Sequence, residues 1–151
     1  MKMRKTQVQI IVFRKNNNSL EFLLLKRIPS KGGFWQPPCG GLEKEDSSII
    51  ECAYREVFEE TNIAKEEVLH VYEDVYYFVM DKHYLTKEPI TPIEEFVFGF
   101  EVLNKTVVDI NKNIYPEHEE FRWVSFHEAL DLLKWEDNKI ALKKLREVLK
   151  I

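Results

Sequence analysis

Two apolar runs near the start of the chain have the composition of β-strands. β-branched and aromatic residues dominate residues 6–14 and again residues 20–27, and a short asparagine-rich turn separates the two runs. We therefore expect a hairpin or a pair of adjacent strands. After a loop, residues 34–36 can form a short strand that the following prolines end. Gly40-Gly41 is then expected to form a turn.

The next segment has the pattern of an amphipathic helix over residues 48–61. Its apolar positions recur at helical spacing on one face: Ile50, Ala53, Tyr54 and Val57. Ser48 and Glu51 have the spacing of a capping box. Asn62 stands where the residue that ends a helix adopts the left-handed conformation, which asparagine tolerates well.

Beyond this helix, the pattern predicts a long β-rich run, a polar loop, two strands and two helices. Their expected residues, in that order, are 68–80, 81–92, 95–103, 121–125, 127–134 and 138–149. Strands dominate the middle of the chain, with helices between and after them. The predicted fold class is therefore α/β or α+β with a mixed sheet.

Length and charge restrict the kind of protein. A chain of 151 residues fits one domain, and a net charge of −4 makes a long nucleic acid an unlikely partner. A phosphorylated small molecule would need a bridging cation. The first apolar run is too short for a signal peptide or a membrane span. Cys39 and Cys52 form neither a disulfide framework nor a zinc site, so we expect free thiols and a cytoplasmic location.

The polar side of the predicted helix carries an acidic stripe. Glu56, Glu59 and Glu60 are three and four residues apart, so their like charges repel and lower the stability of the helix. A hard cation such as Mg²⁺ prefers carboxylate oxygens as ligands. A solvated acidic face is the alternative interpretation. The metal-site interpretation is favoured because Arg55 lies among the glutamates and a glycine pair precedes the helix.

This segment resembles the Nudix box, whose pattern is Gly-x5-Glu-x7-Arg-Glu-U-x-Glu-Glu-x-Gly-U, where U is a bulky apolar residue. The matching residues are Gly41, Arg55, Glu56, Val57, Glu59, Glu60 and Ile63. Two positions depart from the pattern: Ser47 replaces a glutamate, and Asn62 replaces a glycine. The asparagine can keep the same backbone geometry, whereas the serine removes a carboxylate.

The resemblance implies a Nudix α/β/α sandwich with a mixed β-sheet over residues 1–151, and a hydrolase that cleaves a diphosphate linkage by water attack on phosphorus. It implies Mg²⁺, with Mn²⁺ as a possible substitute. Glu56, Glu59 and Glu60 are then the expected metal ligands, and Arg55 is expected to orient them. The backbone of Gly40 and Gly41 is expected to approach the metal or the phosphate.

The later part of the chain is similar to the bacterial nucleoside-triphosphate and dihydroneopterin-triphosphate pyrophosphohydrolase branch. The similar segments are Glu117-His118, Phe121-Arg122-Trp123 and residues 135–138. This similarity implies a nucleoside-triphosphate-like substrate, cleaved to a monophosphate and pyrophosphate. It also implies that Glu117 is a further metal ligand. Glu120 is the second choice, and a solvated acidic turn is the alternative.

Several questions stay open at this level. Phe34 and Trp35 could stack on a base or belong to the core, and the sequence favours neither. A hydrolase of dinucleoside polyphosphates or nucleotide sugars is a second candidate. A Nudix-like binding module that has lost catalysis is a third, and Ser47 is the feature in its favour. Either a monomer or a homodimer is compatible with the sequence.

Overall fold

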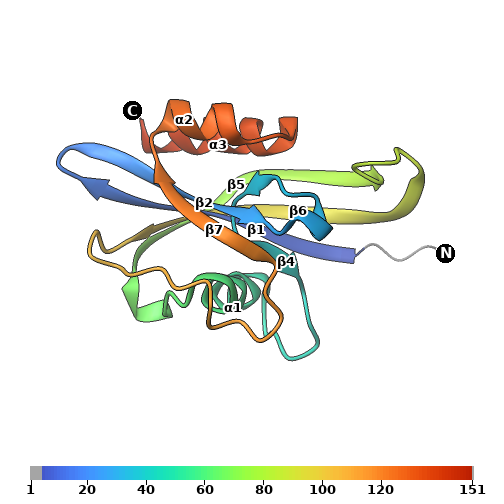
Figure 1. Ribbon diagram of the computed structural model, residues 1–151, viewed down its shortest axis with the longest axis horizontal. Helices are drawn as coiled ribbons and strands as arrows, with labels where there is room; N and C mark the ends of the chain where they lie inside the picture. The colour runs from blue at the N-terminus through green and yellow to red at the C-terminus, as the bar shows by residue number, and fades with distance from the viewer. Residues whose placement is uncertain (1–4, 151) are drawn as a thin grey trace.

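The structure is a computed structural model that describes residues 5–150. The predicted domain limits at residues 1 and 151 therefore lie outside the described residues. The described part is built on one mixed sheet with helices on both of its faces, as Figure 1 shows. This is the α/β class with a mixed sheet that the sequence predicted.

Within residues 5–150, seven strands form the sheet: β1 (Lys5–Asn16), β2 (Ser19–Arg27), β3 (Trp35–Gln36), β4 (Cys39–Gly41), β5 (Val68–Lys82), β6 (Pro89–Val102) and β7 (His118–Val124). The central order is β3-β2-β1-β6-β5, with β4 paired to β1 and β7 paired to β2. β1 and β6 are parallel, and the other pairs are antiparallel. The predicted hairpin is confirmed as β1 and β2.

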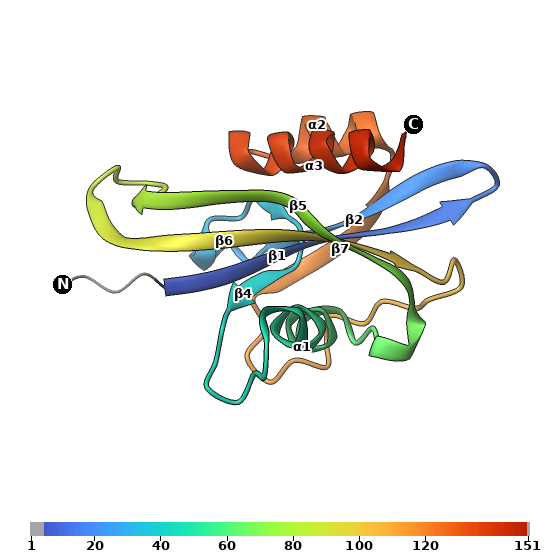
Figure 2. The ribbon, with the colours of Figure 1, turned by 180° about the vertical axis from the view of Figure 1, so that it is seen from behind.

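The helices form two layers, one on each face of the sheet. α1 (Ile49–Thr61) covers one face, and α2 (Phe126–Leu132) and α3 (Glu136–Leu149) cover the other. Figures 1 and 2 show this arrangement from opposite sides. Side chains of β1 point alternately to the two faces of the sheet. Val8 and Ile10 belong to the core under α1, and Ile11 and Phe13 belong to the core under α3.

Three boundaries differ from the sequence prediction. Gly40 and Gly41 do not form a turn, because they lie in β4 and pair with Val8 and Gln7 of β1. The predicted loop over residues 81–92 is shorter, because β5 runs to Lys82 and β6 begins at Pro89. β7 begins three residues early, at His118. β4 and β7 form because they pair with strands far away in the sequence, whereas β5 and β6 extend by pairing with each other across the short loop between them.

The last two helices also shift at their ends. α2 begins at Phe126, where Ser125 forms a complete capping box with Glu128, and α3 begins at Glu136. Within the described residues, no helix has the length and apolar character needed to cross a membrane.

Candidate active site

The geometry of α1 follows from its two ends. The Ser48 hydroxyl accepts a hydrogen bond from the Glu51 amide at 3.2 Å, so the predicted cap is present at the start of the helix. The reciprocal half of the predicted capping box is replaced by an ion pair of Glu51 with Lys65 at 2.9 Å. Asn62 ends the helix with φ 65°, the left-handed conformation that the sequence predicted.

The three glutamates of the acidic stripe differ in exposure. Glu56 and Glu60 are buried, at 8% and 5% relative exposure, whereas the Glu59 side chain is 47% exposed. The apolar face predicted for the same helix packs into the core through Ala53 and Val57. α1 therefore directs two of its carboxylates into the interior, beside the sheet, while the third faces solvent.

Arg55 connects these carboxylates to the loop before the helix. Its Nη1 lies 2.9 Å from Glu56 Oε1 and 3.2 Å from Glu59 Oε2. Its Nε and Nη2 bind the two oxygens of Asp46 at 2.8 and 2.9 Å. Nη2 also donates to the Gly41 carbonyl oxygen at 2.9 Å. A guanidinium with this many hydrogen-bond partners restricts the positions of the acids around it.

Gly40 and Gly41 have different reasons to lack a side chain. A Cβ atom on Gly40 would overlap the carboxylate of Glu56, so the glycine makes room for that buried acid. A Cβ on Gly41 would meet only the Thr6 carbonyl oxygen, at an ordinary 3.9 Å. The group that lies close to Gly40 is thus the Glu56 carboxylate. The Gly41 carbonyl oxygen accepts a hydrogen bond from Arg55.

Burial changes the protonation of both buried acids. Burial raises the pKa of Glu56 from 4.5 to about 7, although the charge and hydrogen bond of Arg55 act in the opposite direction. Burial and the charges of Glu56 and Glu117 raise the pKa of Glu60 well above its usual range, against the hydrogen bond from the Cys39 amide. Neighbouring positive charge would favour the ionised form of both acids.

These residues fit a divalent cation. Among the described residues, Glu60 Oε2 is a buried oxygen without a hydrogen-bond partner. It belongs to a buried pair of carboxylates, Glu56 and Glu60, which offer hard oxygen donors and whose pKa values are raised chiefly by burial. Within residues 5–150, no group of three or more His, Cys, Asp or Glu side chains is already gathered closely enough to hold a metal. Arg55 binds two of the candidate oxygens instead.

The loop before β7 brings Glu117 toward α1. Its charge is one of the causes that raise the pKa of Glu60, and its carbonyl oxygen accepts from the Ile28 amide at 2.9 Å. Glu119 and Glu120 instead form ion pairs, with Lys26 at 3.5 Å and with Arg122 at 3.1 Å. Glu117 is therefore the member of this acidic run that acts on the buried carboxylates.

Arg27, at the end of β2, is a residue that sequence reasoning missed. Its positive charge opposes the larger effect of burial, which raises the pKa values of Cys39 and Glu60, and it adds to burial in lowering the pKa of His118. Its Nε is buried without a hydrogen-bond partner among the described residues, and its guanidinium lies 5.5 Å from the Phe34 ring. The only sequence signal was a basic residue at the end of an apolar strand, which is too common to single out.

Phe34 and Trp35 lie on the opposite side of the sheet from α1. Phe34 is 9% exposed and meets the rings of Tyr84 and Trp135, with centroids 5.8 and 5.4 Å away. Trp35 packs against the core under α3 and has the Arg122 guanidinium 4.8 Å from its ring. The structure thus separates these two aromatic residues from the acids of α1.

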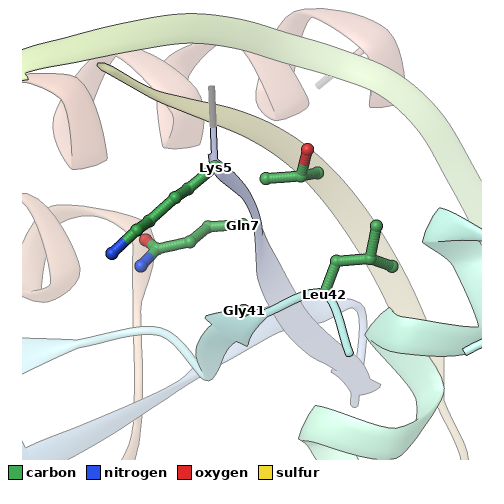
Figure 3. Close-up of a pocket in the computed structure, with 5 residues that line it drawn as sticks. Lys5, Gln7, Gly41 and Leu42 are labelled. Carbon is green, nitrogen blue, oxygen red and sulfur yellow. The ribbon is translucent and has the colours of Figure 1, made fainter. Parts of the chain in front are cut away.

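A pocket of about 340 Å³ opens beside the start of β1 and the end of β4, lined by Lys5, Thr6, Gln7, Gly41 and Leu42. Figure 3 shows the Lys5 and Gln7 side chains pointing to the same side, with Gly41 next to them. The pocket meets the acidic site through Gly41, whose carbonyl oxygen binds Arg55.

The fold and this site define a class: an α/β/α protein with buried acids on a helix that follows a glycine-containing strand. Comparison with known proteins agrees. The model of the NUDIX domain matches residues 3–145, so the chain belongs to the NUDIX family. It is an enzyme of that family, a pyrophosphohydrolase.

Three similar proteins illustrate the likeness. An RNA pyrophosphohydrolase of Pelagibacter ubique is 30% identical over 149 residues, which cover 94% of this chain and 91% of that protein. The asymmetrical bis(5'-nucleosyl)-tetraphosphatase of Rattus norvegicus is 30% identical over 142 residues, which cover 89% and 88%. The crystal structure of a NUDIX hydrolase from Listeria monocytogenes has a TM-score of 0.78 and 31% identity, and the match covers 96% and 94%.

Proposed function

We propose that this enzyme is a magnesium-dependent pyrophosphohydrolase that cleaves a nucleoside-triphosphate-like substrate to a monophosphate and pyrophosphate. The observation that carries the proposal is the pair of buried acids, Glu56 and Glu60. Their pKa values are raised, and Glu60 has an oxygen that no group within residues 5–150 binds by a hydrogen bond. Such a pair needs added positive charge. A divalent cation that also binds phosphate oxygens supplies it.

Each acid has a proposed role. Glu56, Glu59 and Glu60 hold the cation, and Glu117 contributes from the facing loop. When bound, Mg²⁺, or Mn²⁺ in its place, neutralises phosphate charge and makes a bound water more acidic. Glu56, with a pKa of about 7, suits the transfer of the attacking water's proton near neutral pH. The spread of donors over a helix and a loop suits a cation that takes ligands from several directions.

Arg55 acts through the acids rather than on the substrate. Its bonds to Asp46 and Gly41 fix the guanidinium, and the fixed guanidinium then holds Glu56 and Glu59. The hydrogen bonds from Arg55 lower the pKa of Asp46 to about 2, so Asp46 stays ionised at any working pH. We assign Arg55 as a positioning residue on this basis.

The substrate is proposed to lie along β4 and the end of β2. Gly40 and Gly41 contribute backbone there, and Arg27 offers positive charge for phosphate beside the acids. Phe34 and Trp35 remain proposed contacts for the nucleoside. We further propose that residues 1–151 act as a single domain, as a monomer or homodimer. The two free thiols, Cys39 and Cys52, suit a cytoplasmic enzyme.

Other substrates are alternative candidates because similar proteins are named for different substrates. The rat relative is named for dinucleoside tetraphosphate cleavage, and the Pelagibacter relative for RNA. Dinucleoside polyphosphates and nucleotide sugars are therefore the second candidates. A long nucleic acid is not the proposed partner, given the net charge of −4. A non-catalytic binding module is the least supported candidate, since the three glutamates of α1 are present together with their arginine.

A substrate panel with product analysis tests this proposal. It contains dNTPs, NTPs, dihydroneopterin triphosphate, a dinucleoside tetraphosphate, ADP-ribose, a nucleotide sugar and a 5'-triphosphorylated RNA, each with Mg²⁺. The expected result is a monophosphate and pyrophosphate from a triphosphate, with the highest kcat/KM in the panel. Cleavage confined to another member, or no cleavage at all, contradicts the proposed function.

A further inference from the structure

A buried hydrogen bond between two side chains crosses the sheet beside the acidic loop. Gln36 Nε2 of β3 lies 3.0 Å from His118 Nε2 of β7. Both residues are buried, at 6% and 7% exposure. β3 and β7 flank β2, because Leu25 of β2 pairs with Gln36 on one side and with Phe121 on the other. The bond therefore spans β2 and links the strands on its two edges.

This bond lies on the face of the sheet that α1 covers. Leu25 belongs to the core under α1, and Gln36 is its partner in the neighbouring strand. Arg27 is two residues along β2, so it shares this face, and His118 pairs with it. Burial and the charge of Arg27 lower the pKa of His118, and the same charge opposes the effect of burial on the pKa of Glu60. The bond is thus on the side of the buried acids.

The pairing of β2 with β7 shifts by one residue next to His118. Lys26 and Arg27 are neighbours on β2, but their partners on β7 are Glu120 and His118. β7 therefore has a β-bulge with one extra residue. Bulges turn side chains to new directions and are common next to active sites. Glu117 comes directly before His118, so its direction depends on how this first part of β7 is held.

The segment around Glu117 is held through its main chain and through the side chain of its neighbour. The Glu117 carbonyl oxygen accepts a hydrogen bond from the Ile28 amide at 2.9 Å. The His118 ring is held by Gln36. The charge of Glu117 adds to burial in raising the pKa of Glu60. The held segment therefore keeps the Glu117 carboxylate close enough to act on the acids of α1.

The chemistry of the bond suits positioning better than stability. Replacement of both partners of a buried hydrogen bond by apolar groups of the same shape can leave stability nearly unchanged. The bond itself requires a defined geometry, because the Gln36 nitrogen only donates and His118 Nε2 must accept. Burial and the charge of Arg27 lower the pKa of His118 to about 4, so the ring is neutral at pH 7 and can accept.

We propose that Gln36 and His118 are positioning residues, whose hydrogen bond fixes the start of β7 and so holds Glu117 where it meets the cation. The inference rests on the proposed function, because it concerns how one proposed ligand of the cation is held. Groups that hold metal ligands in place change metal affinity by about tenfold to 100-fold when they are lost. Gln36 and His118 act in this way, through Glu117.

The test is a double-mutant cycle between Gln36→Leu and Glu117→Gln, with Mn²⁺ as the probe. Mn²⁺ binding to the wild type, the two single variants and the double variant is measured by electron paramagnetic resonance without substrate. Turnover of the best triphosphate of the substrate panel, and its magnesium requirement, are measured on the same four proteins. Thermal unfolding shows whether each protein is folded.

Gln9→Leu is the matched control. Gln9 is a buried glutamine, 2% exposed, between Val8 and Ile10, which pack under α1, so its side chain lies on the other face of the sheet. The control makes the same chemical change away from the acidic loop and should keep the Mn²⁺ affinity of the wild type. Gln36→Asn, whose side chain is one methylene shorter, replaces Gln36→Leu in the cycle if the leucine variant does not fold.

Gln36→Leu and Glu117→Gln should each weaken Mn²⁺ binding by about tenfold. The double variant should bind Mn²⁺ about as weakly as Glu117→Gln alone, because it has no carboxylate left to position. Effects of independent sites instead multiply, which would give a loss of about 100-fold. Multiplied effects, or a folded Gln36→Leu protein with the Mn²⁺ affinity of the wild type, overturn the inference.

Failure of the proposed function gives a different result. Weaker Mn²⁺ binding in Glu117→Gln but not in Gln36→Leu overturns the inference alone and leaves the proposed metal site in place. Unchanged Mn²⁺ binding in Glu117→Gln removes Glu117 from that site, and the inference with it. Mn²⁺ binding that follows the expected cycle, in a chain that cleaves no triphosphate, supports the positioning role and overturns the proposed function.

Discussion

The two faces of the sheet both bury carboxylic acids, but in different electrostatic settings. At Glu56, on the α1 face, the positive charge of Arg55 opposes the effect of burial. At Glu95, on the α3 face, burial and the negative charge of Asp137 act in the same direction. The first setting combines buried acids with a cationic side chain, and it suits a metal and phosphates. The second setting favours the protonated form of its acid.

The largest expected effect is on turnover, from Glu60→Gln. Stabilisation by a metal contributes several kcal/mol, and each 1.4 kcal/mol changes a rate tenfold, so we expect turnover to fall by about 1,000-fold or more. The substitution keeps the shape of the buried side chain, and the domain should stay folded. Steady-state kinetics with saturating substrate, together with circular dichroism, measure the two quantities.

Glu51→Gln is the matched control on the same helix. Glu51 pairs with Lys65 at the surface, and exposed ion pairs of this kind contribute little to stability. Its turnover should remain near that of the wild type. A Glu60→Gln enzyme that is as fast as Glu51→Gln would remove Glu60 from the proposed metal site.

The next effect concerns stability and pH. The pKa of Glu56 rises on folding from 4.5 to about 7, so the folded state holds its proton more tightly. The resulting stabilisation is complete below pH 4.5 and is lost as pH rises to about 7. It amounts to roughly 3 kcal/mol. With chelator present, wild type should therefore lose stability relative to Glu56→Gln between pH 5 and pH 8. Urea unfolding at both pH values measures the gap, and a constant gap contradicts the raised pKa.

His118 changes the pH dependence of stability in the opposite direction, at lower pH. Burial and the charge of Arg27 lower its pKa from 6.5 to about 4, so its contribution to stability is lost as pH falls from 6.5 to 4. Comparison of wild type with Glu56→Gln at each pH largely cancels this contribution, because both proteins contain His118.

A smaller effect separates the acids of the loop before β7. Glu117 acts on Glu60, whereas Glu119 pairs with Lys26. Glu117→Gln should therefore lower turnover by about tenfold or more and weaken the dependence on Mg²⁺, and Glu119→Gln should change little. Magnesium titrations of the two variants provide the comparison. Equal and mild effects would mean that the loop is only a solvated surface.

The smallest effect is expected at Ser47, where the family pattern has a glutamate. Ser47 is exposed, and Asp46 beside it already holds Arg55 through two hydrogen bonds. Ser47→Glu should therefore leave turnover unchanged or raise it by up to about twofold, and the domain should stay folded because surface substitutions usually change stability by less than about 0.5 kcal/mol. A large loss, measured in the same assay, would show that Ser47 has a role of its own.

The parts of the molecule that local sequence determines were predictable. α1, its cap at Ser48 and its end at Asn62 follow from helical spacing and capping chemistry. The β1–β2 hairpin follows from two apolar runs around a turn. In each case the residues that decide the structure lie within a few positions of one another.

The parts that depend on distant segments were not predictable. Gly40 and Gly41 lie in a strand because they pair with β1. A glycine pair in the sequence does not indicate which strand it will pair with. The electrostatic interactions of Arg27 and Glu95 are with residues that are far away in the sequence. Neither residue belongs to a recognisable sequence motif, so only the folded sheet shows that they lie in unusual electrostatic environments.

The most direct measurement of the central claim is hydrolysis of the preferred triphosphate across a magnesium titration that starts from exhaustively chelated enzyme. Wild type and Glu60→Gln are compared, and pyrophosphate release is the readout. We predict negligible activity without a cation, full recovery with Mg²⁺ or Mn²⁺, and a much higher magnesium requirement with low turnover in Glu60→Gln. Full activity after chelation, or identical magnesium curves for the two proteins, would contradict it.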